Sequence, residues 1–203
     1  MKKIMFNESY GLTEAVLQGR KTMTRRLISN KQAIYSLDEQ EFIGQLAVSE
    51  NFVKKYSRYQ VGEIVAIAQS YKDVYDEMKN PCELFYDRLF YSILKEHKGW
   101  NNKMFVKAEF MPHRIRFTDL KVERLQDISD EDCAKEGVRH FIDYSKERIE
   151  RFYIDAIPNY HPGSMTTYDS VKEAFAALID KVSGSGTWER NPWVFAYTYE
   201  LVK

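Results

Sequence analysis

The segment His113–Gln126 constrains the fold most strongly, because its apolar and polar residues alternate as they do in a β-strand. Ile115 and Phe117 are separated by one polar residue, and apolar residues return at Leu120. The phase shifts by one residue at Thr118–Asp119. Since successive side chains of a strand lie on opposite faces, this shift predicts a bulge, a turn or a sharp bend within the segment.

Four further strands are expected, at Lys3–Asn7, Thr22–Ile28, Glu63–Ala68 and Trp193–Val202. The third is apolar on both faces, as in a central strand, whereas the last carries its aromatic residues on one face and should be half-buried. Helices are expected at Leu12–Gln18, after the capping serine Ser129 as far as Gly137, and from Ser170 to Gly184. No strict strand–helix–strand repeat connects these segments, so the order favours an α+β fold with a small mixed sheet or barrel.

The composition excludes several classes of protein. The chain has 203 residues with 44% hydrophobic residues, enough for one ordinary domain, and no repeat or flexible linker divides it. Thirty Lys and Arg balance thirty Asp and Glu, which excludes a strongly basic nucleic-acid-binding coat but leaves room for a local basic patch.

The sequence also predicts where in the cell the protein is found. The segment Met1–Asn7 turns polar too early for a signal peptide, and no apolar run is long enough to span a membrane. The two cysteines, Cys82 and Cys133, exclude a disulfide framework and suit a reducing compartment. We therefore expect a cytoplasmic protein without membrane contact.

The densest chemical cluster is Gly19–Arg26, in which four cations and two threonines follow a helix end: Arg20, Lys21, Thr22, Thr24, Arg25 and Arg26. One interpretation is a solvated basic turn, with Thr24 present for its β-propensity. The other is a cleft for an anion or nucleic acid, in which the cations contact phosphate. A threonine beside a lysine can also be a nucleophile if the lysine takes its proton.

The string Leu17–Arg26 resembles the signature of the activating-signal-cointegrator homology (ASCH) domains, a branch of the PUA-like β-barrel superfamily. Three further stretches resemble the family in the same order, at Val61–Val65, Leu125–Val138 and Trp188–Val194. Together these motifs cover about half of the chain, and the last resembles larger, often phage-derived members. The resemblance implies a single domain over residues 1–203, an α+β PUA-like small mixed β-barrel with flanking helices. Residues 30–60, 72–105 and 139–165 would be helical or loop insertions, the second with a possible helix at Glu83–His97.

The resemblance also implies a function. ASCH domains are proposed to bind RNA or modified nucleotides; some bacterial members are amidohydrolases that remove an acyl group from the exocyclic amine of cytidine, and a few are described as nucleases. The residues of the amidohydrolase motif fall on Lys21, Thr24 and Glu136. Arg20, Thr22, Arg25 and Arg26 would then bind the nucleic acid or substrate, in a cleft between the helix at Leu12–Gln18 and the strand edges near Thr24.

The chemistry of this trio is coherent, since amide hydrolysis needs a nucleophile, a proton carrier and a group that orients them. Glu136 precedes Gly137 in the last turn of a helix, where a carboxylate is disfavoured unless a cation such as Lys21 compensates it. The alternative is a solvated glutamate beside Lys135. Lys21 and Thr24 are three residues apart, so in an unbroken strand they would lie on opposite faces. They meet only if the chain bends near Thr22 or if Lys21 belongs to the turn.

No metal site and no cofactor are expected. The four histidines lack metal-ligand spacing and the two cysteines lie far apart: His97, His113, His140 and His161, with Cys82 and Cys133. The aromatic runs at Tyr71–Tyr75 and Phe85–Tyr91 fit packing better than base stacking. Two other functions stay open, namely a non-catalytic protein-interaction module that uses the insertions and a nuclease-like protein. The sequence says nothing about protein partners.

Overall fold

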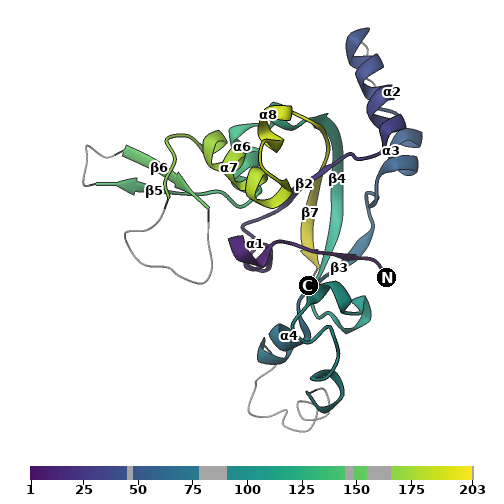
Figure 1. Ribbon diagram of the computed structural model, residues 1–203, viewed down its shortest axis with the longest axis vertical. Helices are drawn as coiled ribbons and strands as arrows, with labels where there is room; N and C mark the ends of the chain where they lie inside the picture. Colours follow the sequence, from purple (N-terminus) through teal and green to yellow (C-terminus); the bar gives the residue numbers. More distant parts are fainter. Residues whose placement is uncertain (45–47, 78–90, 145–148, 155–165, 203) are drawn as a thin grey trace.

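A computed structural model of the chain describes residues 1–44, 48–77, 91–144, 149–154 and 166–202. The fold is α+β and mixed, as the sequence predicted (Figure 1). A five-stranded sheet has the order β1-β3-β4-β7-β2, with the bounds Lys3–Ile4, Ile64–Ile67, Arg114–Arg124, Trp193–Val202 and Met23–Leu27. β1 pairs with β3 in parallel, and every other neighbouring pair is antiparallel.

β4 contains the irregularity that the sequence predicted. Its register with β7 shifts between Phe117 and Asp119. The extra residue, Thr118, lets the strand bend while apolar side chains stay on the core side. The position of this bulge agrees with the phase shift in the sequence.

The two edges of the sheet are β1 and β2. No backbone ladder joins these two strands in the described part of the chain, so the sheet is not closed into a barrel by backbone hydrogen bonds. One side-chain contact crosses the gap, since Nη2 of Arg26 in β2 donates to the carbonyl oxygen of Met5, just beyond β1, at 2.7 Å.

The predicted helices around the sheet are present. They are α1 (Leu12–Leu17), α6 (Asp130–Lys135) and α7 (Val171–Ser183), followed by the short α8 (Thr187–Arg190). The hydroxyl of Ser129 accepts from the backbone N–H of Asp132, and that of Ser170 from Glu173, each at 3.1 Å. These contacts satisfy N–H groups that a helix start otherwise leaves unpaired.

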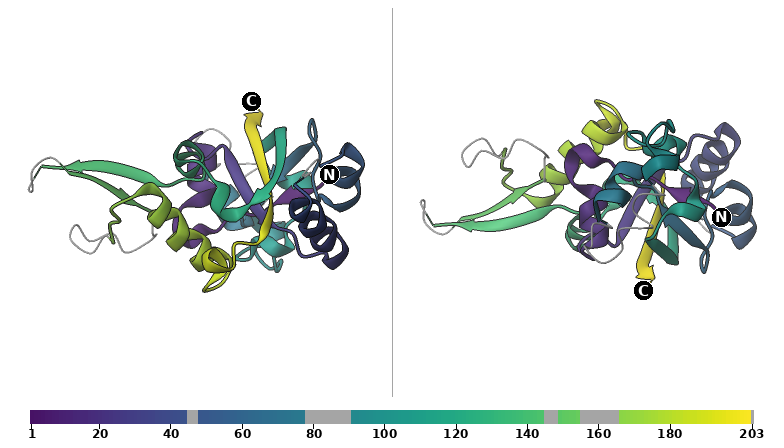
Figure 2. Two further views of the ribbon diagram at one scale, coloured as in Figure 1. Left: turned by 90° about the horizontal axis from the view of Figure 1, so that it is seen from above. Right: turned by 90° about the horizontal axis from the view of Figure 1, so that it is seen from below.

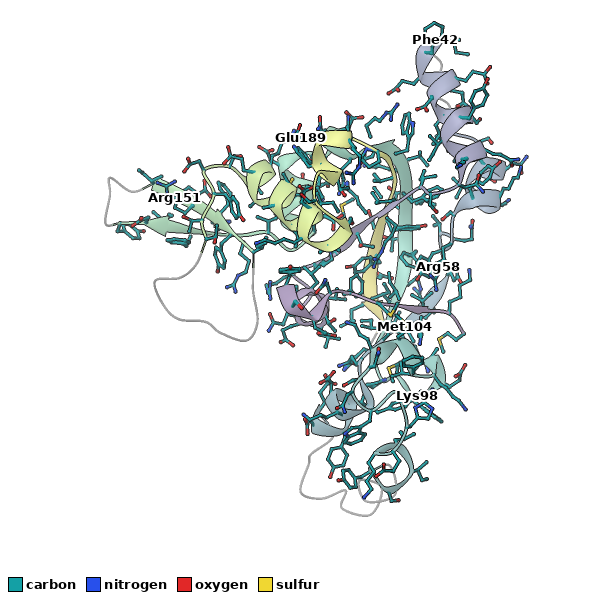
Figure 3. All side chains as sticks on the ribbon, in the orientation of Figure 1. Phe42, Arg58, Lys98, Met104, Arg151 and Glu189 are labelled. Carbon is teal, nitrogen blue, oxygen red and sulfur yellow. The ribbon has the colours of Figure 1, made fainter. Side chains whose placement is uncertain are left out.

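The three predicted insertions carry structure of their own, and they extend away from the sheet (Figures 1 and 2). The first holds α2 (Lys31–Phe42) and α3 (Glu50–Tyr56), the second overlaps α4 (Tyr71–Glu77), and the third holds a hairpin of β5 (Arg139–Asp143) and β6 (Ile149–Tyr153). Short 3₁₀ turns complete the described chain: Glu8–Tyr10, Lys103–Phe105, Ala108–Phe110 and Leu125–Asp127. Figure 3 shows Phe42 at the outer end of α2 and Arg151 on the hairpin.

The predicted helix at Glu83–His97 lies mostly outside the described residues, although residues 91–94 are helical. Of the predicted aromatic runs, Tyr71–Tyr75 begins α4, whereas residues 85–90 of the second run lie outside the described part. The sequence did not predict the hairpin of β5 and β6. Its strands are five residues long, and their sequences do not alternate between apolar and polar residues. Neither strand has a fully buried face, so folding does not require such a pattern here.

The core lies on both faces of β3. Val65 and Ile67 belong to the main cluster with α1 and α7, whereas Ala66 belongs to a second cluster with α4. β3 is therefore a central strand, as predicted. The expectation of a half-buried β7 was wrong for its first half, because Val194 and Ala196 are as buried as the aromatic residues that alternate with them, Trp193, Phe195 and Tyr197. No helix in the described part of the chain is long and apolar enough to cross a membrane.

Candidate active site

Lys21 is placed by the turn after α1. Gly19 has a positive φ of 71°, which an L side chain rarely adopts, and the chain reverses there. The N–H groups of Arg20 and Lys21 both donate to the carbonyl oxygen of Ala15 at 2.9 Å. Lys21 therefore belongs to the turn and not to β2, which removes the difficulty of its three-residue spacing from Thr24.

The Lys21 side chain contacts Glu136, as the family resemblance implied, and Glu136 is not the solvated glutamate of the alternative interpretation. Its Nζ donates to the Glu136 carboxylate at 2.5 Å and to the Glu136 backbone carbonyl at 2.7 Å. Both side chains are buried, with exposed fractions of 2% and 5%. The backbone N–H of Thr22 donates to the carbonyl oxygen of Lys135 at 2.9 Å and fixes the turn against the end of α6. The two charges are therefore held together by backbone as well as side-chain contacts.

Arg25 completes the ion-pair cluster. Its guanidinium contacts Glu136 at 3.2 Å, Glu123 at 2.6 Å and Asp132 at 3.3 Å, and its side chain is 1% exposed. The cluster thus joins two buried cations to three carboxylates that are at most 19% exposed. The more exposed Lys135 also contacts Asp132, at 3.6 Å. The positive charge of Arg25 is compensated within the protein, so it is not available to a phosphate without breaking these pairs.

Thr24 lies in β2 opposite Tyr197 of β7 and is 4% exposed. Thr24 also lines a pocket, so a bound molecule can reach this residue.

We call this cavity the Lys21 pocket; its volume is about 250 Å³. It lies against α1 and β2, as predicted, but α7 forms another wall. The lining residues are Phe6, Asn7, Leu12, Lys21, Thr24, Arg25, Arg26, Leu27, Glu136, Phe175, Leu178, Ile179, Val182 and Ser183. The sequence analysis missed the α7 wall. Its apolar stripe was visible, but a stripe that packs on a core and one that also lines a pocket have the same periodicity.

The surroundings shift the protonation of three groups. Burial lowers the pKa of Lys21 below the usual 10.5; the Glu136 carboxylate opposes this, while the charges of Arg26 and Arg25 lower it further. Burial, with the negative charge of Glu136, raises the pKa of the Tyr199 phenol well above 10.0. Burial also raises the pKa of the Cys133 thiol to about 12, so this cysteine is a poor nucleophile at neutral pH.

The remaining predicted binding residues lie apart from the ion-pair cluster. Arg20 and Thr22 do not line the Lys21 pocket, and Nε of Arg20 donates to the side chain of Gln18 at 2.8 Å. Arg26 lines the pocket and lies over the Phe6 ring, 5.8 Å from its centroid. The structure therefore divides the four cations of the motif: Lys21 and Arg25 share the ion-pair cluster, whereas Arg20 and Arg26 lie outside it.

In the described part of the chain, no group of three or more His, Cys, Asp or Glu side chains is arranged to hold a metal ion. His113 instead contacts Glu77 at 3.0 Å, and His140 lies 3.9 Å from Glu150. Comparison of the chain with protein-family models, curated proteins and solved structures gave no match.

Proposed function

We propose that this chain is an ASCH-type protein that binds a modified nucleoside in the Lys21 pocket and hydrolyses an amide on the exocyclic amine of an acylated base such as cytidine. One observation carries the proposal. The buried Lys21–Glu136 pair and Thr24, a lysine, a carboxylate and a hydroxyl from distant parts of the chain, line the same pocket.

A PUA-like barrel is part of this proposal. The four stretches that resemble the family lead into or contain core elements: β2, β3, α6 and β7. The bulge in β4 supports strong curvature of the sheet. The hydrogen bond from Arg26 to Met5 supports the approach of the two edge strands that a barrel requires. A cytoplasmic location likewise stays a prediction from the sequence.

The reaction proceeds in two steps. In the first, Oγ1 of Thr24 attacks the acyl carbon, and its proton passes to the neutral amine of Lys21. Lys21 then protonates the leaving nitrogen, the amide C–N bond breaks, and the free base leaves an acyl ester on Thr24. In the second, water attacks the ester, its proton passes through Lys21 to Oγ1 of Thr24, and a carboxylic acid is released.

Glu136 and Arg25 position the proton carrier. Glu136 holds Nζ of Lys21 with its carboxylate and its carbonyl oxygen, and Arg25 fixes the other carboxylate oxygen. A lysine takes a proton only when it is neutral, and burial favours that form. The apolar wall of α7 adds a dry surface for a base.

The test is release of cytidine from cytidine acetylated on its exocyclic amine, followed by chromatography. Thr24→Val removes the hydroxyl with little change of shape, and Lys21→Ala removes the amine. We expect each to lower kcat/KM by about 10²–10⁴-fold, the usual range for a positioned proton carrier or nucleophile. Thr22→Val is the matched control, since Thr22 lies two residues away and does not line the pocket.

Full activity of either variant would refute the mechanism. Binding of the acetylated nucleoside to the wild-type protein without turnover would reduce the function to recognition in this pocket. Loss of activity in Thr22→Val as well would show that the effects come from disturbance of β2.

A further inference from the structure

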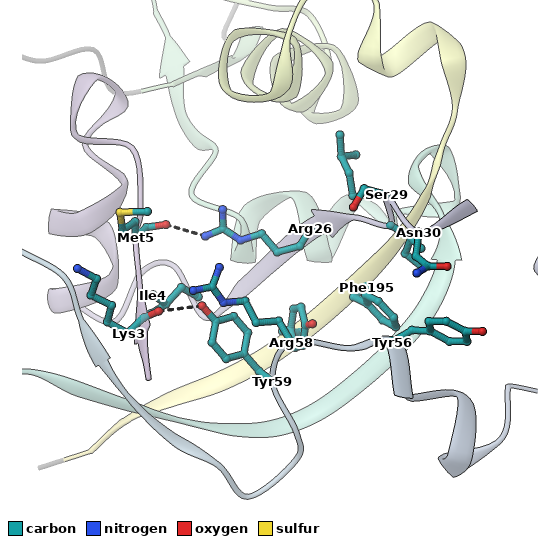
Figure 4. Close-up of a pocket in the computed structure, with 13 residues that line it drawn as sticks. Lys3, Ile4, Met5, Arg26, Ser29, Asn30, Tyr56, Arg58, Tyr59 and Phe195 are labelled. Atoms are coloured by element: carbon teal, nitrogen blue, oxygen red, sulfur yellow. Dashed lines mark hydrogen bonds between the residues drawn. The ribbon is translucent and has the colours of Figure 1, made fainter. Parts of the chain in front are cut away.

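A second pocket lies in the gap between the edge strands β1 and β2, and we call it the edge-strand pocket (Figure 4). Its volume is about 370 Å³, larger than that of the Lys21 pocket. It is lined by Lys3, Ile4, Met5, Arg26, Leu27, Ile28, Ser29, Asn30, Tyr56, Arg58, Tyr59, Phe195 and Tyr197. Three of these side chains are cationic and four are aromatic, and none is a carboxylate.

Two of the cations, Arg26 and Arg58, make few hydrogen bonds to the part of the chain that the structure describes. Nη2 of Arg26 donates to the Met5 carbonyl, and Arg58 lies over the Tyr59 ring, 5.5 Å from its centroid. Among the described residues, no carboxylate lies within 4.0 Å of either guanidinium. Figure 4 shows both side chains extending toward β1. Since a guanidinium presents five N–H donors, the pair offers several donors to one anion.

Lys3 adds positive charge at the same place. Its Nζ is fixed by the carbonyl oxygens of Met104 and Val106, each at 2.7 Å. Burial and the charge of Arg58 both lower the pKa of Lys3. The charge of Lys3 adds to that of the two arginines, and all three attract an anion.

The aromatic part of the pocket lies beside the cations. Tyr59, Phe195 and Tyr197 are at most 4% exposed, whereas Tyr56 is only partly buried. The Tyr197 hydroxyl shares a hydrogen bond of 2.7 Å with Ser57, so its ring is held in place. Fixed aromatic rings next to guanidinium groups are the combination that holds a base and its phosphate in single-stranded nucleic acids.

We propose that the edge-strand pocket binds a nucleoside phosphate, with the phosphate on Arg26 and Arg58 and the base against Tyr56. Arg26 and Leu27 also line the Lys21 pocket, so the two pockets are adjacent. The nucleoside phosphate has two sources, a free nucleotide or one residue of a single strand. A single strand would extend from this pocket into the Lys21 pocket, and this alternative rests on the proposed function.

Calorimetric titration tests the proposal with three probes: cytidine, cytidine 5′-monophosphate and a single-stranded hexacytidylate. None carries an acyl group, so binding is measured without hydrolysis, and failure of one proposal does not entail failure of the other. We expect the monophosphate to bind at least about tenfold more tightly than cytidine, because charge-assisted hydrogen bonds to phosphate are strong. Arg58→Gln, an exposed change that does not touch the Lys21 pocket, should weaken monophosphate binding about five- to tenfold.

Lys54→Gln is the matched control, since it removes an exposed charge from α3 without touching the edge-strand pocket. Equal binding of cytidine and its monophosphate, or wild-type affinity of Arg58→Gln for the monophosphate, overturns the proposal. If the hexamer binds more tightly than the monophosphate and both depend on Arg58, the source is a strand. If the hexamer and the monophosphate bind with equal affinity and both depend on Arg58, the source is a free nucleotide.

Discussion

Arg25 and Arg26 are neighbours in β2, yet their surroundings differ completely. Arg25 is buried among the carboxylates of Glu123, Asp132 and Glu136. Arg26 is only partly buried, and its guanidinium donates to the backbone carbonyl of Met5. The first arginine belongs to the internal framework of the Lys21 pocket. The second lies at the boundary between that pocket and the edge-strand pocket.

This difference separates two uses of positive charge. An arginine whose charge is compensated inside the protein orients other groups, and its loss breaks the ion pairs that it makes with them. An arginine without an acidic partner is available to a ligand. We therefore assign to Arg25 a positioning role and to Arg26 a binding role, although both belong to one basic motif.

The two arginines should differ most in their contribution to the free energy of unfolding. Arg25→Gln should lower the free energy of unfolding by about 3–5 kcal/mol, because it breaks the mostly buried ion-pair cluster and removes the cation that Glu123 contacts. Arg26→Gln should lower it by less than about 1 kcal/mol, since it removes one hydrogen bond from a partly exposed group. Urea unfolding at neutral pH, followed by circular dichroism, measures both. Equal losses in the two variants would remove the distinction between a framework arginine and a binding arginine.

The pH profile of hydrolysis tests the link between Arg26 and Lys21. The reactive form of Lys21 is the neutral amine, whose fraction rises with pH until the pH exceeds the pKa of Lys21. Because burial lowers that pKa, kcat/KM should rise about tenfold per pH unit and level off below pH 10.5. The charge of Arg26 also lowers this pKa, so Arg26→Gln should move the profile to higher pH.

Arg116→Gln is the control for the profile, since Arg116 is exposed on β4 and pairs with Glu200. The same displacement in both variants would point to a general effect of net charge. A profile that falls as the pH rises from neutral would exclude a neutral Lys21 as the proton carrier.

The sequence predicted the backbone better than the surroundings of the charges. The bulge in β4 and the start of α7 follow from local rules, namely the alternation of faces and the N-terminal cap, and both are observed. The contact between Lys21 and Glu136 was predicted from the family resemblance. The partners of Arg25 were not, because Glu123 comes from β4 and Asp132 from α6. No local pattern indicates which cation of a basic motif will meet distant carboxylates.

The edge-strand pocket was missed for a related reason. Its lining comes from β1, from β2 and the residues after it, from β7, and from the end of α3 with the segment that follows. Only the folded sheet brings these parts together. Arg58 lay within a predicted insertion, where an exposed arginine carries no signal in a single sequence. The aromatic residues of β7 were correctly assigned to a strand, but the alternation does not show that Phe195 and Tyr197 also border a cavity.

The smallest expected effect concerns salt. For single strands, the logarithm of the binding constant falls with the logarithm of the salt concentration, with a slope of about 0.7 per phosphate contact. Arg58→Gln should therefore reduce the slope for hexacytidylate by about 0.7, which is a two- to threefold change between about 50 and 200 mM salt. Arg25→Gln, measured where it is still folded, should keep the wild-type slope because its charge is compensated internally. Fluorescence anisotropy over a salt series measures both slopes, and an equal reduction in the two variants would contradict the division of roles between the two pockets.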